Sequence, residues 1–241
     1  MTTWWPWARL AAAALTAAAI VAQLIRTVER TLAASDPWTA HVPTVISNFF
    51  SFFTILSNVG AVVALAIAGV WMLRHATASV PQWLATLLLC VSTYMIVTGI
   101  VYNILLRGIA LDQGSTVWWS NEVLHVVTPL FLLADVLFAP RPRALPWSSL
   151  WIVAAFPIVW VVYTLIRANF ITGPATGDPW WYPYPFLDPH LVPGGYLGVV
   201  GYVIGIAVAI IAVAAGVLWV GRRRASSATV PLLEDAALSG P

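Results

Sequence analysis

The stretch YLGVVGYVIGIAVAIIAVAAGVLWV, Tyr196–Val220, decides the fold class because it contains no charged side chain. A helix that crosses about 30 Å of hydrocarbon needs roughly 20 mostly apolar residues. Five other stretches also meet this requirement: Trp7–Ile25, Asn48–Leu73, Trp83–Leu106, Asn121–Phe138 and Leu150–Ile166. The sequence therefore predicts an all-α integral membrane protein whose six transmembrane helices form one bundle.

The composition agrees with this fold class and excludes several kinds of function. The chain has 241 residues, of which 61% are hydrophobic and 8% charged, whereas a soluble domain has about 25% charged residues. This rules out a soluble globule, a disordered chain and a nucleic-acid binder. All 11 basic residues are arginine, so there is no lysine for a Schiff base or a P-loop. The single cysteine, Cys90, excludes an intrachain disulfide and a CxxC site.

The distribution of arginine predicts the orientation of the six helices. With the N-terminus inside, seven arginines fall in cytoplasmic segments and four in outer loops, which favours both termini in the cytoplasm of a multi-pass plasma membrane protein. We expect a membrane domain over residues 1–224 and a disordered cytoplasmic tail over 225–241. A cleaved signal peptide that ends near Ala33–Ala34 is the alternative for the first span.

Polar side chains recur at helical spacing in three of the predicted spans. The stripes are Ser47, Ser51, Thr54 and Asn58 in the second span, Tyr94, Thr98 and Tyr102 in the third, and Asn121, His125, Thr128 and Asp135 in the fourth. Intervals of three and four residues place side chains on one face of a helix. We expect these faces to point into the bundle, because lipid offers no hydrogen-bond partner.

Thr54 and His125 are predicted to lie at nearly the same depth. With a rise of 1.5 Å per residue, Thr54 lies about 9 Å and His125 about 6 Å below the outer end of its span. A hydroxyl and a neutral imidazole at one level are the minimum for a nucleophile and its base. Glu122 is near the same level but on another face of the helix, and Asp135 is too deep to orient His125.

Structural roles remain open for all of these polar residues. Membrane threonines commonly bond their own helix, and Asn58, Asn103 and Asn121 can hold helices together as well as donate to an oxyanion. Tyr102 is a further candidate donor by its depth. A zinc site from His41, His125 and His190 is an alternative without supporting ligand spacing. The sequence predicts no metal and no organic cofactor.

The longest outer loop contains DPWWYPYPFLDPHLVPGGY, Asp178–Tyr196, which is rich in proline and aromatic residues. Proline stiffens such a segment, and aromatic rings suit the headgroup layer of a membrane. Long loops without regular structure are often functional. We expect this segment either to cap a pocket in the bundle or to serve as a connector on the membrane surface.

Three motifs together carry a resemblance to a known family. They are SFFTILSN (Ser51–Asn58), NEVLHVVTP (Asn121–Pro129) and WWYPYPFLDP (Trp180–Pro189), in this order on a six-span chain. This pattern resembles the androgen-induced FAR-17a-like membrane family, which includes the androgen-dependent TFPI-regulating protein and bacterial six-helix relatives. The resemblance covers about residues 10 to 220.

The resemblance implies a threonine hydrolase that cleaves fatty acid esters of hydroxy fatty acids or similar lipid esters. Thr54 matches the essential threonine of the family, and His125, four residues after Asn121, matches the essential histidine. The family usually has a second histidine where this chain has Glu122. The expected partners are membrane lipids and a lipid ester substrate. The alternative is a non-enzymatic bundle that binds or transports lipid, and the sequence leaves the oligomeric state open.

Overall fold

The computed structural model of this protein describes residues 4–108 and 116–238, and their side chains as far as Ser227. The described part of the chain is helical and contains no strand. Its elements are α1 (Trp5–Leu32), α2 (Val42–Phe49), α3 (Phe53–Arg74), α4 (Gln82–Val101), η1 (Tyr102–Leu106), α5 (Trp118–Glu122), η2 (Val123–Val127), α6 (Thr128–Phe138), α7 (Ser149–Ala168), η3 (Pro185–Leu187) and α8 (Tyr196–Leu238). Six helical segments of this part are long and apolar enough to cross a membrane, which confirms the predicted number.

The predicted second span is wrong in one respect, because it is not one helix from Asn48 to Leu73. Helix α2 ends at Phe49, and α3 starts afresh at Phe53. The expected stripe of polar residues is therefore divided: Ser47 lies in α2, Ser51 lies between the helices, and Thr54 lies in the first turn of α3. Thr54 is consequently at a helix N-terminus instead of inside a continuous helix.

Side chains from distant parts of the chain satisfy the backbone at this break. The indole of Trp160 in α7 donates to the Ser51 carbonyl at 2.9 Å, and the Tyr184 hydroxyl accepts the Thr54 N–H at 3.2 Å. Arg167 in α7 donates to the Asn48 side chain at 2.7 Å. Irregular backbone at membrane depth persists only where protein groups replace the missing hydrogen bonds. The break therefore depends on tertiary contacts that local sequence spacing does not reveal.

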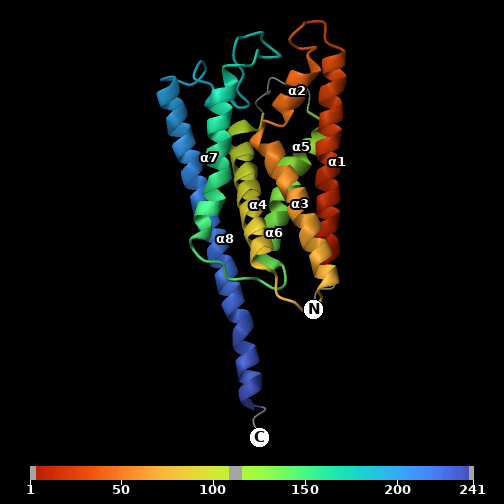
Figure 1. Ribbon diagram of the computed structural model, residues 1–241, viewed down its shortest axis with the longest axis vertical. Helices are drawn as coiled ribbons and strands as arrows, with labels where there is room; N and C mark the ends of the chain where they lie inside the picture. Colours follow the sequence, from red (N-terminus) through yellow and green to blue (C-terminus); the bar gives the residue numbers. More distant parts are fainter. Residues whose placement is uncertain (1–3, 109–115, 239–241) are drawn as a thin grey trace.

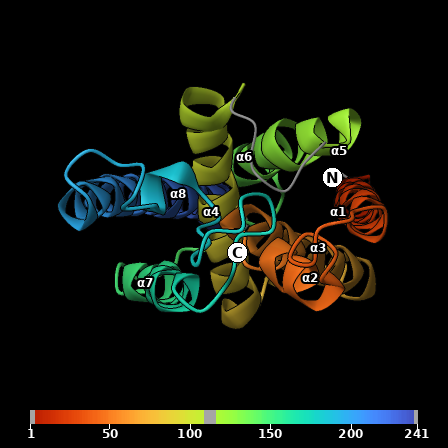
Figure 2. The ribbon, with the colours of Figure 1, turned by 90° about the horizontal axis from the view of Figure 1, so that it is seen from above.

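Helix α4 occupies the centre of the bundle, as the view from above shows (Figure 2). It contacts α3 and α6 on one side and α7 and α8 on the other, and a larger share of it is buried than of any other span. Helices α7 and α8 are the most exposed spans. The bundle thus has two halves that meet at α4, and the half formed by α7 and α8 is the more exposed to lipid.

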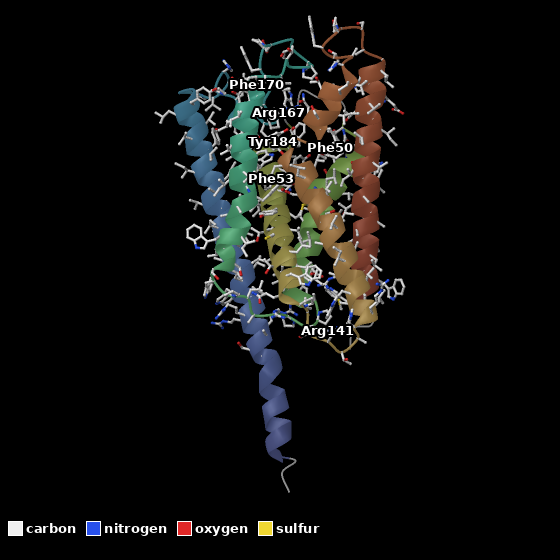
Figure 3. All side chains as sticks on the ribbon, viewed as in Figure 1. Phe50, Phe53, Arg141, Arg167, Phe170 and Tyr184 are labelled. Atoms are coloured by element: carbon white, nitrogen blue, oxygen red, sulfur yellow. The ribbon has the colours of Figure 1, made fainter. Side chains whose placement is uncertain are left out.

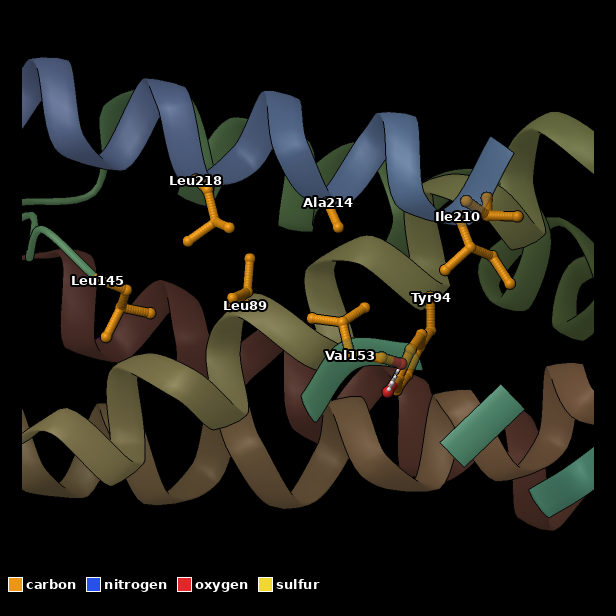
Figure 4. Close-up of a cluster of buried hydrophobic side chains, with 8 residues drawn as sticks. Leu89, Tyr94, Leu145, Val153, Ile210, Ala214 and Leu218 are labelled. Carbon is orange, nitrogen blue, oxygen red and sulfur yellow. Dashed lines mark hydrogen bonds between the residues drawn. The ribbon is translucent and has the colours of Figure 1, made fainter. Parts of the chain in front are cut away.

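A cluster of buried apolar side chains joins α4 to α7 and α8 (Figure 4). Its members include Leu89 and Tyr94 of α4, Val153 of α7, and Ala214 and Leu218 of α8. The Tyr94 hydroxyl donates to the Val153 carbonyl at 2.8 Å, which satisfies its polar tip. This cluster holds the two halves together below the level of the candidate site.

A buried ion pair connects the first and fourth spans. The guanidinium of Arg9 in α1 donates from Nε and Nη2 to the two carboxylate oxygens of Asp135 in α6, both at 2.8 Å. The indole of Trp5 donates to the same carboxylate at 2.7 Å. Arg9 and Asp135 are 3% and 5% exposed. Asp135 therefore has a structural partner far from His125, as its predicted depth implied.

Both ends of the chain lie at the same end of the bundle (Figure 1). We call this the terminal end, and the opposite end, which carries α2 and the 169–195 segment, the loop end. Helix α8 has 43 residues and extends beyond the other helices past the terminal end (Figure 1). The cytoplasmic orientation of the terminal end, and the division into a membrane domain and a disordered tail, stay predictions.

Candidate functional site

Thr54 lies where α3 begins, with its side chain next to the hydroxyl of Tyr184. The Tyr184 oxygen accepts the Thr54 N–H, and the two hydroxyl oxygens are also 3.2 Å apart. The first N–H groups of a helix have no partner within the helix and carry a partial positive charge. The Thr54 hydroxyl is therefore close to groups that stabilise negative charge on an oxygen.

Tyr184 reaches this position because the 169–195 segment folds back into the bundle. Figure 3 shows Tyr184 just above Phe53 at the loop end. Its ring is 4% exposed and packs edge-on against Phe52 and flat against Phe186. Burial raises the pKa of the Tyr184 phenol, and the hydrogen bonds from Thr54 oppose this rise. Tyr184 is therefore a neutral hydroxyl beside Thr54.

His125 lies on the neighbouring side of the bundle, in the π-helical segment η2. Its Nδ1 bonds the Asn121 carbonyl at 2.9 Å. Because a carbonyl only accepts, Nδ1 carries the proton, and in the neutral ring Nε2 has the free lone pair. The orienting group for His125 is thus a backbone carbonyl of its own helix.

The ring of Tyr102, in the second π-helical segment η1, stacks on His125 with centroids 4.0 Å apart. The Tyr102 hydroxyl accepts a hydrogen bond from the side chain of Asn121. A glycine makes this contact possible, because a Cβ on Gly99 would lie 3.0 Å from Pro129 and 3.3 Å from the His125 carbonyl. Single π turns inside α-helices are frequent at functional sites, and here two of them face each other.

Asn58 connects the two sides of the site. Its side-chain amide donates to the carbonyls of Thr54 at 2.9 Å and of Leu124 at 3.2 Å. Thr54 and the residue that precedes His125 are therefore at one level, in agreement with the depth calculated from the sequence. Both contacts use the same Nδ2 group, so Asn58 holds the helices and does not donate into a cavity.

Thr54 and His125 make no direct hydrogen bond with each other in the described part of the chain. The Thr54 hydroxyl bonds Tyr184, and the His125 ring bonds Asn121 and stacks on Tyr102. The predicted nucleophile and base share a level and a neighbourhood, but the structure has Tyr184 as the immediate partner of Thr54. Their catalytic roles stay a prediction.

An apolar cavity of about 120 Å³ lies between Thr54 and the helices α4, α7 and α8. Its few polar wall groups include Thr54, Thr98, Tyr102 and Tyr184. The hydroxyl of Thr98, a member of the polar stripe predicted for the third span, is buried without a hydrogen-bond partner among the described residues. Phe186 and Leu187 also line the cavity, so the proline-rich segment contributes part of its wall.

A second cavity, of about 340 Å³, lies within the 169–195 segment at the loop end. Its walls include the carboxylates of Asp178 and Asp188 and the ring of His190. Tyr184 lines this cavity as well as the apolar one. Tyr184 therefore forms part of the wall that separates a polar cavity from the Thr54 hydroxyl.

Two of the predicted polar candidates have other partners. Asn103 is exposed, donates to the Gly99 carbonyl at 2.7 Å and accepts from Arg107 at 2.9 Å, so it faces away from the cavity. Glu122 pairs with Arg107 at 3.1 Å, and this hydrogen bond raises the pKa of Arg107. The Glu122 carboxylate thus links α5 to Arg107 at the end of η1.

The zinc alternative has no support in the described residues, which contain no group of three potential ligands. The His41 ring bonds Thr44 at 2.7 Å, and the His190 ring stacks on Trp180 with centroids 3.7 Å apart. Each of the three histidines therefore has a separate structural partner.

No family model, curated protein or solved structure matches this chain. The resemblance to the androgen-induced FAR-17a-like family therefore stays a prediction that is carried by the three sequence motifs.

Sequence reasoning missed Tyr184 as a residue of the site. The sequence leaves the proline-rich segment either as a cap or as a connector, and its alternating aromatic and proline residues do not indicate which ring points inward. The only available signal was that a tyrosine carries a polar tip on an apolar ring, which suits it to end beside a buried polar group.

Proposed function

We propose that this protein is an intramembrane hydrolase of lipid esters, with Thr54 as the nucleophile and His125 as the general base. The observation that carries the proposal is the Thr54 hydroxyl at the wall of an apolar cavity, in the first turn of a helix and beside the Tyr184 hydroxyl. An apolar wall suits an acyl chain, and the polar groups converge at one end.

The proposed reaction has two steps. His125 Nε2 accepts the Thr54 proton through a bound water, because the two side chains have no direct hydrogen bond, and the Thr54 oxygen attacks the ester carbonyl. The C–O bond of the ester breaks, and the alcohol leaves with the proton held by the imidazolium. Water then attacks the acyl-threonine, which releases the carboxylic acid and restores the Thr54 hydroxyl.

Tyr184 and the first turn of α3 are the proposed stabilisers of the negative oxygen that forms during each attack. The Tyr184 oxygen accepts the Thr54 N–H, so its own proton is free to bond either Thr54 or a substrate oxygen. The N–H groups at the start of α3 add positive electrostatic potential. Donors aimed at a developing oxyanion are commonly the largest contribution to catalysis.

The lipid reaches the cavity sideways, between α7 and α8. Ile158 of α7 and Ala207 of α8 line the cavity and are also exposed on the outside of the bundle. An ester can therefore enter from the membrane without passing through water. Water comes from the polar cavity of the 169–195 segment, with Tyr184 at the boundary between the two.

The proposal is tested with purified protein in detergent and a panel of fatty acid esters of hydroxy fatty acids. Thr54→Ala and His125→Ala should each reduce release of fatty acid by at least about a hundredfold, within the range of acid–base and nucleophilic contributions. Thr27→Ala and His75→Ala are matched controls, because Thr27 bonds only its own helix at 2.8 Å and His75 is exposed at the terminal end.

A fluorophosphonate probe provides a second measurement, which does not depend on knowing the natural ester. The probe should label Thr54 in the wild-type protein and leave Thr54→Ala unlabelled. Full activity of both Thr54→Ala and His125→Ala would disprove the hydrolase. A lipid-binding protein is then the remaining function, since the cavity would still accept an acyl chain beside the Thr54–Tyr184 pair.

A further inference from the structure

A third cavity lies at the terminal end of the bundle, away from Thr54. It has a volume of about 100 Å³ between α4, α6, α8 and the 139–145 segment. Its charged wall groups are Arg9, Asp135, Arg141, Arg143 and Arg224. Since Arg9 and Asp135 neutralise each other in a bidentate pair, three arginines give the cavity an uncompensated positive charge.

Backbone carbonyls hold these three arginines in place. Arg224 donates to the carbonyls of Val136 at 2.9 Å and Ala139 at 2.6 Å, at the end of α6. Arg143 donates from Nη1 to the Val80 carbonyl at 2.6 Å. A guanidinium has five N–H donors, so each arginine is anchored by some of its donors and has others left for a ligand.

Arg141 has an unusual backbone conformation, which brings its side chain to the same place. Its φ of +60° makes it the only non-glycine residue with a positive φ in the described ranges. Its Nη1 donates to the carbonyls of His75 at 2.7 Å and Ala78 at 3.2 Å. Such a conformation costs about 1–3 kcal/mol and persists where the surroundings enforce it, often at ligand sites. Figure 3 places Arg141 at the terminal end, opposite Tyr184.

The remainder of the cavity wall is apolar. Leu88 and Leu89 of α4 face Val217 and Leu218 of α8 across it, and Leu88 and Val217 are half-buried at the surface of the bundle. A ligand that fits both the arginine wall and the apolar wall of this cavity has an anionic group next to the arginines and an apolar chain between α4 and α8.

We propose that this cavity binds the phosphate of an anionic phospholipid, with an acyl chain between α4 and α8. Planar guanidinium groups match phosphate oxygens through paired, charge-assisted hydrogen bonds. The site is separate from the Thr54 cavity and does not depend on the proposed hydrolase. Its consequence is that the protein retains an anionic lipid in preference to zwitterionic phosphatidylcholine, because the excess positive charge of the three arginines disfavours the cationic choline group.

The experiment compares nanodiscs of phosphatidylcholine alone with nanodiscs that also contain phosphatidylglycerol. Native mass spectrometry counts the lipids that stay bound, and the unfolding temperature reports binding independently. Arg143→Gln and Arg141→Gln should each weaken phosphatidylglycerol retention by roughly tenfold, the effect of losing one charge-assisted contact. Arg74→Gln is the matched control, because Arg74 is an exposed arginine at the same end that does not line the cavity.

Each outcome decides the proposal. Selective retention by the wild type and by Arg74→Gln, with loss in the cavity variants, supports a lipid site. Displacement of the lipid by millimolar inorganic phosphate would show that the phosphate group alone suffices and that a free anion is also a ligand. Equal retention of both lipids by the wild type, or equal loss in all three variants, would overturn it. A variant that folds poorly has a lower unfolding temperature than the wild type in phosphatidylcholine alone. In that case the preference of the wild type for phosphatidylglycerol over phosphatidylcholine decides whether the lipid site exists.

Discussion

The Tyr184 hydroxyl lies beside the Thr54 hydroxyl, at the wall of the apolar cavity. It accepts the Thr54 N–H and lies within hydrogen-bond distance of the Thr54 hydroxyl. A tyrosine so deeply buried keeps its proton, because burial raises its pKa. The pair therefore combines a nucleophile candidate with a neutral donor at the start of a helix.

Tyr184→Phe should reduce ester hydrolysis by on the order of a hundredfold, which is the effect of removing one oxyanion donor. It should also lower the free energy of unfolding by about 1–3 kcal/mol, because the Thr54 N–H loses its buried partner. Hydrolysis is followed by fatty acid release and stability by denaturant titration. Tyr196→Phe is the control, since Tyr196 is 55% exposed and bonds only Tyr182. Unchanged hydrolysis in Tyr184→Phe would show that the Tyr184 hydroxyl does not stabilise the oxyanion.

Asp135→Asn should destabilise the protein by about 3–5 kcal/mol, because it leaves the buried Arg9 guanidinium without a counter-charge. The double variant Arg9→Met with Asp135→Leu should recover most of this loss, since it removes both charges. Thermal unfolding of the three proteins measures the effect. Glu29→Gln at an exposed pair with Arg26, 3.7 Å apart, should change stability by less than about 1 kcal/mol. A loss of stability well below this range in Asp135→Asn would show that water compensates the charge of Arg9.

At the scale of elements, the break between α2 and α3 and the two π segments act together. The break places Thr54 in the buried first turn of α3, and the rings of Tyr102 and His125, one from each π segment, stack on each other. All three irregularities lie near one level of the bundle, on either side of Asn58. Regular helices would place none of these groups in this arrangement.

The proposed lipid route between α7 and α8 leads to a prediction about substrate length. Ala207→Trp should narrow the opening and lower turnover of long-chain esters by about tenfold or more, because a bulky ring fills the cavity mouth. A short water-soluble ester should lose much less turnover, because it has no long acyl chain to pass between α7 and α8. The control Val208→Trp changes a residue that is 63% exposed and does not line the cavity. Equal loss with both esters would place the route for lipid elsewhere.

At the scale of the whole molecule, an even number of spans places both ends of the chain at one end of the bundle (Figure 1). The terminal end carries seven of the arginines (Arg9, Arg74, Arg141, Arg143, Arg222, Arg223 and Arg224), whereas the loop end carries four (Arg26, Arg30, Arg107 and Arg167) together with acidic residues such as Asp36, Asp178 and Asp188. Arginine-rich ends face the cytoplasm in membrane proteins. The proposed lipid site would then bind a lipid of the inner leaflet, and the Thr54 cavity would lie nearer the outer one.

This orientation is testable by cysteine labelling in a Cys90→Ser background. A membrane-impermeant maleimide should label Ser35→Cys, at the loop end, in intact cells, and Ser79→Cys, at the terminal end, only after permeabilisation. Both serines are exposed, so access across the membrane is the difference between them. The opposite pattern would invert the orientation and move the Thr54 cavity to the cytoplasmic side.

The sequence by itself determined the all-helical fold class and the number of apolar spans, and it predicted a common level for Thr54 and His125. These properties follow from local composition and from the constant rise of a helix, because each apolar stretch must cross the hydrocarbon independently of the others. The proline and aromatic residues of the 178–196 segment also indicated a stiff segment that either caps a pocket or connects two spans.

Only the tertiary structure decided that Tyr184 meets Thr54, that Arg9 meets Asp135, and that the second span breaks at Phe50. The first pair is separated by 130 positions in the chain and the second by 126. Contacts at such separation depend on how helices rotate and pack around α4. Spacing within one helix specifies which residues share a face, but it does not specify which face of another helix they meet, and that choice assembles the candidate site.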